Sequence, residues 1–308
     1  MKIGVDIGGT KCAVVLGDET HVEKRVVFPT EDLDTTVENI IAAVAAVGKG
    51  DAIGISCGGP LDSKQGLILS PPNLPSWDRV PIAEILSDRF GVPAYLENDA
   101  NACALAEWRY GAGKGTENMV FLTFGTGLGA GLILGGRLYS GTNGMAGEVG
   151  HIRLLDHGPV GYGKAGSLEG FCSGNGLAQI GRELALEQLQ VGKTLPYCAC
   201  HEDLDGINAK TLAEFARAGE PVAAEAFRVC GEMLGRGLSV IVDILNPEAI
   251  VIGSVFQRAE DLLRGPMEEV LRRESLTRSR EVCRILPAAL GDRIGDFAAL
   301  AVAYDHSL

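Results

Sequence analysis

A turn of glycines between two apolar strands occurs twice in this chain, and this repeat limits the possible folds more than any other feature. The first copy is centred on Gly8-Gly9-Thr10 and the second on Gly125–Gly129. The flanking strands are predicted over residues 2–7, 12–16, 119–124 and 130–134. A repeat spaced about one domain apart predicts two similar halves.

Helices and strands alternate after each turn. In the first half, a helix is predicted to begin at Thr35-Thr36, and another runs from Asp99 to Gly111. Strands precede Gly58-Gly59-Pro60 and Asp99, over residues 52–56 and 92–96. In the second half, helices are predicted over 227–245, 259–273 and 293–304, and strands over 249–253 and 282–286. This alternation is typical of the α/β class.

The length of 308 residues agrees with two domains of about 150 residues each. The predicted boundary is the glycine-rich linker Gly111–Gly115, which has the composition of a hinge. A smaller N-terminal lobe is expected over residues 1–111, completed by the C-terminal helix within 293–308. A larger lobe is expected over residues 112–292, with a cleft between the two lobes.

Charge and cysteine content exclude several classes of function. The chain has 27 Lys and Arg against 40 Asp and Glu, and this net charge of −13 argues against nucleic-acid and anionic-membrane partners. Asp6 interrupts any N-terminal signal core and no apolar run reaches about 18 residues, so a cytoplasmic location is expected. The 8 cysteines favour reduced, buried thiols. The cluster Cys198-Ala199-Cys200-His201 is expected to be a loop, because four-coordinate zinc needs further ligands.

Both glycine turns could bind phosphate through their backbone N–H groups. Where side chains are missing, backbone N–H groups can approach phosphate oxygens. Each turn alone is as well explained as a simple hairpin, but their matched placement favours a triphosphate held by the two turns. Asp6, directly before the first turn, is then expected to hold a magnesium ion through water.

Asp99 is the sharpest candidate for catalysis. It lies between a strand and an alanine-rich helix, where the helix dipole favours a negative charge and a carboxylate can accept a proton from a substrate hydroxyl. A simple helix cap is the alternative explanation. Asn98 beside it favours a polar pocket. Glu148, His151 and Glu169 lie among glycines and are candidates for binding a polyhydroxylated ligand, although each taken singly fits a solvated loop.

An ordered set of motifs resembles the ROK family of bacterial sugar kinases and related repressors, within the actin-like and Hsp70-like ATPase folds. The similarity extends almost from end to end. It is carried by Asp6–Lys11, Gly58-Gly59-Pro60, Asn73–Trp77, Glu97–Ala102 continuing to Glu107, Gly125–Gly129 and Gly147–His151. The resemblance implies two ribonuclease-H-like lobes and a homodimer or higher homo-oligomer.

The same resemblance implies an ATP- and Mg²⁺-dependent, glucokinase-like enzyme that phosphorylates the 6-hydroxyl of a hexose. Asp99 would be the base, and the sugar would be bound by Gly59, Asn98, Glu148, His151 and Glu169. The nucleotide and its phosphates would be bound by Asp6, Gly8, Gly9, Thr10, Lys11, Gly125, Thr126 and Gly127, with Gly253 as a weaker match.

The chain departs from the family at a cysteine cluster that holds a structural zinc ion together with the histidine. The three cysteine positions are occupied here by Val160, Tyr162 and Ser167. No structural zinc is therefore expected, and another partner must orient His151.

Several alternatives remain open at this stage. Glucose is the favoured substrate, but an N-acetylated hexosamine, mannose, fructose or allose would need only a different pocket shape, and the donor need not be ATP alone. A sugar-responsive repressor or another non-catalytic sugar-binding protein is the alternative of a different class. The phosphate turn begins at Asp6, which leaves no room for a preceding helix-turn-helix domain.

Overall fold

A computed structural model describes residues 1–306 of the chain, and residues 307 and 308 of the predicted C-terminal helical segment lie outside the described residues. The first sheet has the strand order β3-β2-β1-β4-β7. Its strands are β1 (Lys2–Ile7), β2 (Lys11–Gly17), β3 (Val22–Pro29), β4 (Ile53–Cys57) and β7 (Ala94–Asn98). β1 pairs antiparallel with β2 and parallel with β4, and β4 pairs parallel with β7.

The second sheet repeats this topology, with the order β10-β9-β8-β13-β14. Its strands are β8 (Met119–Phe124), β9 (Leu128–Leu134), β10 (Arg137–Leu138), β13 (Ala249–Ile252) and β14 (Arg284–Pro287). In both sheets, the first strand in the chain is central, the second and third lie on one side, and the fourth and fifth on the other. The repeat predicted from the two glycine turns is therefore confirmed.

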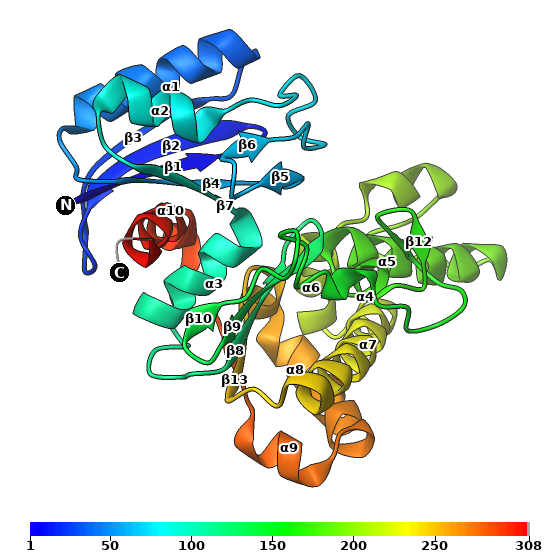
Figure 1. Cartoon of the computed structure of the whole chain (residues 1–308). Helices are drawn as coiled ribbons and strands as arrows, with labels where there is room; N and C mark the ends of the chain where they lie inside the picture. The colour runs from blue at the N-terminus through cyan, green and yellow to red at the C-terminus, as the bar shows by residue number, and fades with distance from the viewer. Residues whose placement is uncertain (307–308) are drawn as a thin grey trace. The chain divides into compact units, whose positions relative to one another are not determined.

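Helices cover both faces of the first sheet. They are α1 (Leu33–Val47), α2 (Ile82–Phe90), α3 (Asp99–Tyr110) and α10 (Ile294–Asp305). α1 and α2 lie on one face, and α10 packs against β1 and β4 on the other (Figure 1). The α1 helix begins two residues earlier than predicted, because the Asp32 side chain caps it by accepting the N–H of Thr35 at 3.0 Å.

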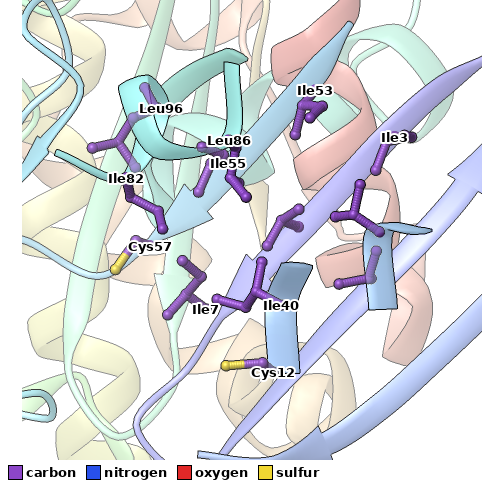
Figure 2. Packing of buried hydrophobic residues seen from close by; sticks show 14 of the residues in the cluster. Ile3, Ile7, Cys12, Ile40, Ile53, Ile55, Cys57, Ile82, Leu86 and Leu96 are labelled. Carbon is purple, nitrogen blue, oxygen red and sulfur yellow. The ribbon is translucent and has the colours of Figure 1, made fainter. Parts of the chain in front are cut away.

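Apolar side chains of the first sheet and of α1 and α2 form a continuous core (Figure 2). Ile7, Ile40 and Ile55 are at most 2% exposed. A central strand with both faces covered is buried at successive positions, as β4 is along its whole length. This packing fixes the carboxyl ends of β1, β4 and β7, from which the candidate site is built.

The second half carries most of the remaining helices. These are α4 (Leu168–Phe171), α5 (Gly174–Gln190), α6 (Ala209–Arg217), α7 (Pro221–Leu245), α8 (Val255–Glu274) and α9 (Thr277–Val282). α7 packs along α8 and also contacts α5 and α6. Two small hairpins complete the structure: β5 (Leu61–Asp62) with β6 (Leu67–Ile68), and β11 (Val160–Gly161) with β12 (Lys164–Ala165).

The described chain forms two compact units. The first unit consists of residues 1–121, 131–146 and the described part of 289–308, and the second of residues 122–130 and 147–288. The C-terminal helix α10 thus belongs to the first unit. Among residues 1–306, none of the helices is long and apolar enough to cross a membrane.

Candidate active site

In the first unit, the candidate residues follow the ends of three neighbouring parallel strands. The register pairs Ile7 of β1 with Cys57 of β4, and Cys57 with Asn98 of β7. Because parallel strands end at the same edge of a sheet, the first glycine turn, Gly58-Gly59 and Asn98-Asp99 meet there. A Cβ built on Gly59 would lie 3.2 Å from Asn98 Nδ2, and one built on Gly58 would lie 3.9 Å from Asp99 Oδ2.

Asn98, and not Asp99, is the N-cap of α3. Its Oδ1 accepts the N–H of Ala100 at 3.0 Å, and Asp99 is the first residue of the helix. Asp99 Oδ1 also accepts the N–H of Ala100, at 2.8 Å, and Asp99 is an exposed residue. The N-cap role considered for Asp99 is therefore filled mainly by Asn98. The Asp99 carboxylate lies in the first turn of α3, at the positive end of the helix dipole.

Asp6 lies in a concentration of negative charge within the first unit. Burial, followed by the carboxylates of Asp99 and Asp296, raises the pKa of Asp6 to about 6. Arg25 Nε donates to both oxygens of Asp296, at 3.0 and 2.8 Å, and so compensates that carboxylate directly. A Cβ built on Gly295 would lie 2.7 Å from Asp6 Oδ2, so this glycine lets α10 approach the carboxylate.

The first glycine turn is held by backbone and side-chain hydrogen bonds, which leave its tip exposed. Gly8 N–H donates to the carbonyl of Lys11 at 3.1 Å, and Thr30 Oγ1 donates to the carbonyl of Gly8 at 2.6 Å. Gly9, Thr10 and Lys11 are exposed. A Cβ on Gly9 would lie 2.5 Å from the Cβ of Asn73, so no larger residue fits at this position.

The second glycine turn lies in the second unit and is anchored along its length. Gly174 at the start of α5 donates its N–H to the carbonyl of Gly125 at 2.8 Å. Thr123 Oγ1 accepts the N–H of Gly129 at 2.8 Å, and Glu169 Oε2 accepts the N–H of Leu128 at 2.9 Å. A Cβ on Gly125 would meet nothing within 4 Å, so this part of the turn is open to a ligand.

A cavity of about 940 Å³ adjoins this turn within the second unit. That volume is at the upper end of the range of roughly 300–1,000 Å³ that small-molecule sites have. Its lining combines the turn, the starts of α5 and α8, and α6, and includes Gly125, Thr126, Asn175, Arg182, Asn208, Lys210, Arg217, Ser254 and Arg258. The glycine turn offers backbone N–H groups to an anionic part of a ligand, and Ala178, Phe227 and Val255 in the same lining offer apolar contacts.

Glu148, His151 and Glu169 are brought together in the second unit. Glu148 and His151 are the exposed ends of one 3-10 turn, in which His151 N–H donates to the carbonyl of Glu148 at 3.1 Å. Leu168 N–H donates to the carbonyl of Ile152 at 2.8 Å, which places α4 and its Glu169 against this turn. A Cβ on the intervening Gly150 would lie 3.3 Å from the Cβ of Glu169.

The β11–β12 hairpin supplies the partners of His151. Lys164 Nζ donates to the carbonyl of His151 at 2.6 Å, and the Tyr162 ring meets the imidazole edge-on with centroids 6.4 Å apart. Gln179 bonds both the N–H and the carbonyl of Val160 at 2.9 Å. Ser167 caps α4 by accepting the N–H of Gly170 at 3.1 Å. Among residues 1–306, no group of three or more His, Cys, Asp or Glu is placed to hold a metal ion.

Sequence reasoning identifies only part of this arrangement. The predicted turn at Gly253 borders the cavity, which is lined by the next residue, Ser254, while Gly253 itself is buried and donates its N–H to the carbonyl of Leu122 at 3.0 Å. Arg182 donates to the carbonyls of Leu204, Asp205 and Ile207 and so shapes the cavity wall. The helix α6 is absent from the predicted elements; Asn208, an N-cap before an amphipathic segment, is the signal that could indicate the helix, though not its place beside the glycine turn.

Comparison with known proteins agrees with this fold. The model of the ROK family matches residues 2–306. A glucokinase of Streptomyces coelicolor is 33% identical over 96% of this chain and 95% of its own length. Among solved structures, a ROK hexokinase from Thermus thermophilus has a TM-score of 0.83 and 32% identity, covering 99% of this chain and 98% of its own. A ROK family glucokinase from Streptomyces griseus, solved with glucose and AMPPNP, has a TM-score of 0.78 and 33% identity, covering 98% of this chain and 99% of its own.

The duplicated sheet, the paired glycine turns and these similarities define a class, the ATP-dependent sugar kinases with the two-lobe actin-like fold. The chain belongs to the ROK family.

Proposed function

We propose that the chain transfers the terminal phosphate of ATP to the 6-hydroxyl of a hexose, with glucose as the preferred acceptor. The observation that carries this proposal is the arrangement of Asn98 and Asp99 at the start of α3, beside Gly59. A carboxylate at this position accepts the proton of the attacking hydroxyl. Glucose is favoured because the glucokinases of Streptomyces coelicolor and Streptomyces griseus are similar over almost the whole chain.

Each side chain has a separate task in this proposal. Asn98 Oδ1 is used in capping α3, so its Nδ2, which faces Gly59, is the group that donates to a sugar hydroxyl. Glu148, His151 and Glu169 bind ring hydroxyls. Hydroxyl groups accept and donate, so a mixture of carboxylates and an imidazole can hold them in one orientation.

The nucleotide is assigned to the cavity of about 940 Å³ and the turn beside it. The turn Gly125–Gly127, through the N–H groups of Thr126 and Gly127, is proposed to hold its phosphates together with the turn Gly8–Lys11, whereas the Gly125 N–H donates to the carbonyl of Gly127 at 3.0 Å. Positioning of this kind contributes most of the catalysis in phosphoryl transfer, where the attacking and leaving oxygens must lie in line.

Mg²⁺ fits the residues around Asp6. Burial and, after it, the neighbouring carboxylates raise the pKa of Asp6, and a divalent cation would stabilise its ionised form. Asp6 is proposed to hold the ion through water. When bound, the ion neutralises charge on the transferred phosphate.

A panel of hexoses with ATP and Mg²⁺, followed by phosphorus and proton NMR of the product, tests this proposal. Glucose 6-phosphate should be the main product, and mannose, fructose, allose and N-acetylated hexosamines should react with lower kcat/KM. Phosphate on another hydroxyl, or a hexosamine that reacts faster than glucose, would contradict the assignment. A homo-oligomer, also proposed, is tested by light scattering after size-exclusion chromatography, where a monomer would contradict it.

A further inference from the structure

Glu169 makes a hydrogen bond that the proposed sugar contact does not explain. Its Oε2 atom accepts the backbone N–H of Leu128 at 2.9 Å. Leu128 directly follows Gly127 and begins β9, whereas Glu169 lies in the first turn of α4, 41 residues further along the chain. A side chain from a separate element therefore holds the end of the glycine turn.

The position of this carboxylate is fixed by three glycines. A Cβ on Gly127 would lie 2.7 Å from Glu169 Oε2, and one on Gly161 would lie 2.9 Å from the Cβ of Glu169. On Gly150 the added atom would lie 3.3 Å from the same Cβ. Backbone from the turn, from the His151 loop and from the β11–β12 hairpin thus surrounds one side chain, which leaves the carboxylate little freedom to rotate.

The first part of the turn is held by backbone bonds, and its last part is held by side chains. Gly125 accepts from Gly174 and donates to the carbonyl of Gly127 at 3.0 Å, whereas among residues 1–306 the side chains that bond the turn are those of Glu169, at Leu128, and Thr123, at Gly129. Glycine has more conformational freedom than any other residue, so a turn built from it depends on external bonds for its shape. A backbone N–H that donates to a carboxylate makes one of the stronger bonds of this kind.

We propose that Glu169 is a positioning residue for the nucleotide turn in addition to being a sugar ligand. This inference rests on the proposed function for the sugar contact but not for the bond to Leu128. Oε2 holds the turn in its phosphate-binding shape, and Oε1 is assigned to a sugar hydroxyl. The Glu169 carboxylate thereby contacts both the nucleotide turn and the sugar, which Glu148 and His151 of the second unit also bind in this proposal.

Calorimetric titration with AMPPNP and Mg²⁺, in the absence of sugar, tests the inference on the full chain. Glu169→Ala should weaken AMPPNP binding by about tenfold, which corresponds to the loss of one hydrogen bond to a charged group. Glu169→Gln should bind AMPPNP within about twofold of the native affinity, because its amide oxygen can accept the same N–H. Both variants should raise the KM for the hexose.

Glu148→Ala is the matched control, since it removes an exposed carboxylate from the same loop without a bond to the turn. It should raise the KM for the hexose and leave AMPPNP affinity unchanged. If Glu169→Ala does not fold, Glu169→Asp replaces it, because the shorter side chain withdraws the carboxylate from Leu128 and should also weaken AMPPNP binding.

Native AMPPNP affinity in a folded Glu169→Ala or Glu169→Asp variant would overturn the inference. Failure of the native chain to phosphorylate any hexose would instead overturn the proposed function, and the titration without sugar would still decide the role of Glu169.

Discussion

Asp6 shows at the residue scale how a functional group can oppose stability. Burial, followed by the negative charges of Asp99 and Asp296, raises the pKa of Asp6 to about 6 from an ordinary value of 3.8. A group whose pKa is higher in the folded state favours folding while it is protonated and opposes folding once it is ionised. Its penalty is therefore absent below about pH 4, grows as the pH rises, and is complete above about pH 6.

Replacing Asp6 with Asn should stabilise the metal-free protein at pH 7.5, since the amide carries no charge. The pKa difference corresponds to an upper limit of roughly 3 kcal/mol in the free energy of unfolding. Urea denaturation at pH 7.5 and pH 4 measures the effect, which should disappear at the lower pH. The same variant should lose most of its Mg²⁺-dependent turnover.

Equal stability of Asp6→Asn and the native protein at pH 7.5, without metal, would contradict this account of Asp6. Asp88→Asn is the matched control because Asp88 is an exposed residue of α2. It should change the free energy of unfolding by no more than about 0.5 kcal/mol at either pH.

At the element scale, the contact of β4 with α10 shows why the C-terminal helix matters. A Cβ built on Gly54 would lie 2.1 Å from the carbonyl oxygen of Ala299 and 2.5 Å from the N atom of Ala303. Both neighbours are backbone atoms and cannot move aside as a flexible side chain would. Gly54 thus sets the distance between α10 and the first sheet, whose strands β1, β4 and β7 end at the candidate site.

Gly54→Ala should therefore lower the free energy of unfolding by about 1–3 kcal/mol or more, as overpacking of a core does. Chemical denaturation measures the loss. A variant as stable as the native protein would show that α10 packs further from β4 than the structure has it.

The β11–β12 hairpin lies where the resemblance to the ROK family implies a zinc-binding cysteine cluster, and no structural zinc ion is predicted in this chain. Lys164 and Tyr162 contact His151, and Gln179 bonds Val160, so we predict that these contacts hold the loop without an ion. A zinc-selective chelator should leave the melting temperature unchanged, and full activity should remain when Mg²⁺ is supplied. Stoichiometric zinc in the purified protein, together with a lower melting temperature after its removal, would contradict this prediction.

At the scale of the whole molecule, the sequence predicts the elements better than the ligand cavity. The bounds of β1 and β8 agree with the apolar runs 2–7 and 119–124, because each strand is marked by a glycine turn next to it. No such local pattern in the sequence identifies Arg182 and Lys210 as residues that line the cavity. These residues lie on α5 and α6, which reach the glycine turn through their packing on α7 and through the bond from Gly174 of α5 to Gly125.

The central claim is that Asp99 removes a proton from a hexose hydroxyl while ATP is the donor. ADP release with ATP and Mg²⁺, measured with and without glucose for the native chain and for Asp99→Asn, tests it most directly. The account predicts glucose-dependent ADP release that falls by about 10²–10⁴-fold in kcat in the variant, with AMPPNP affinity retained. Glucose binding without ADP release in the native chain, or full turnover by Asp99→Asn, would contradict it.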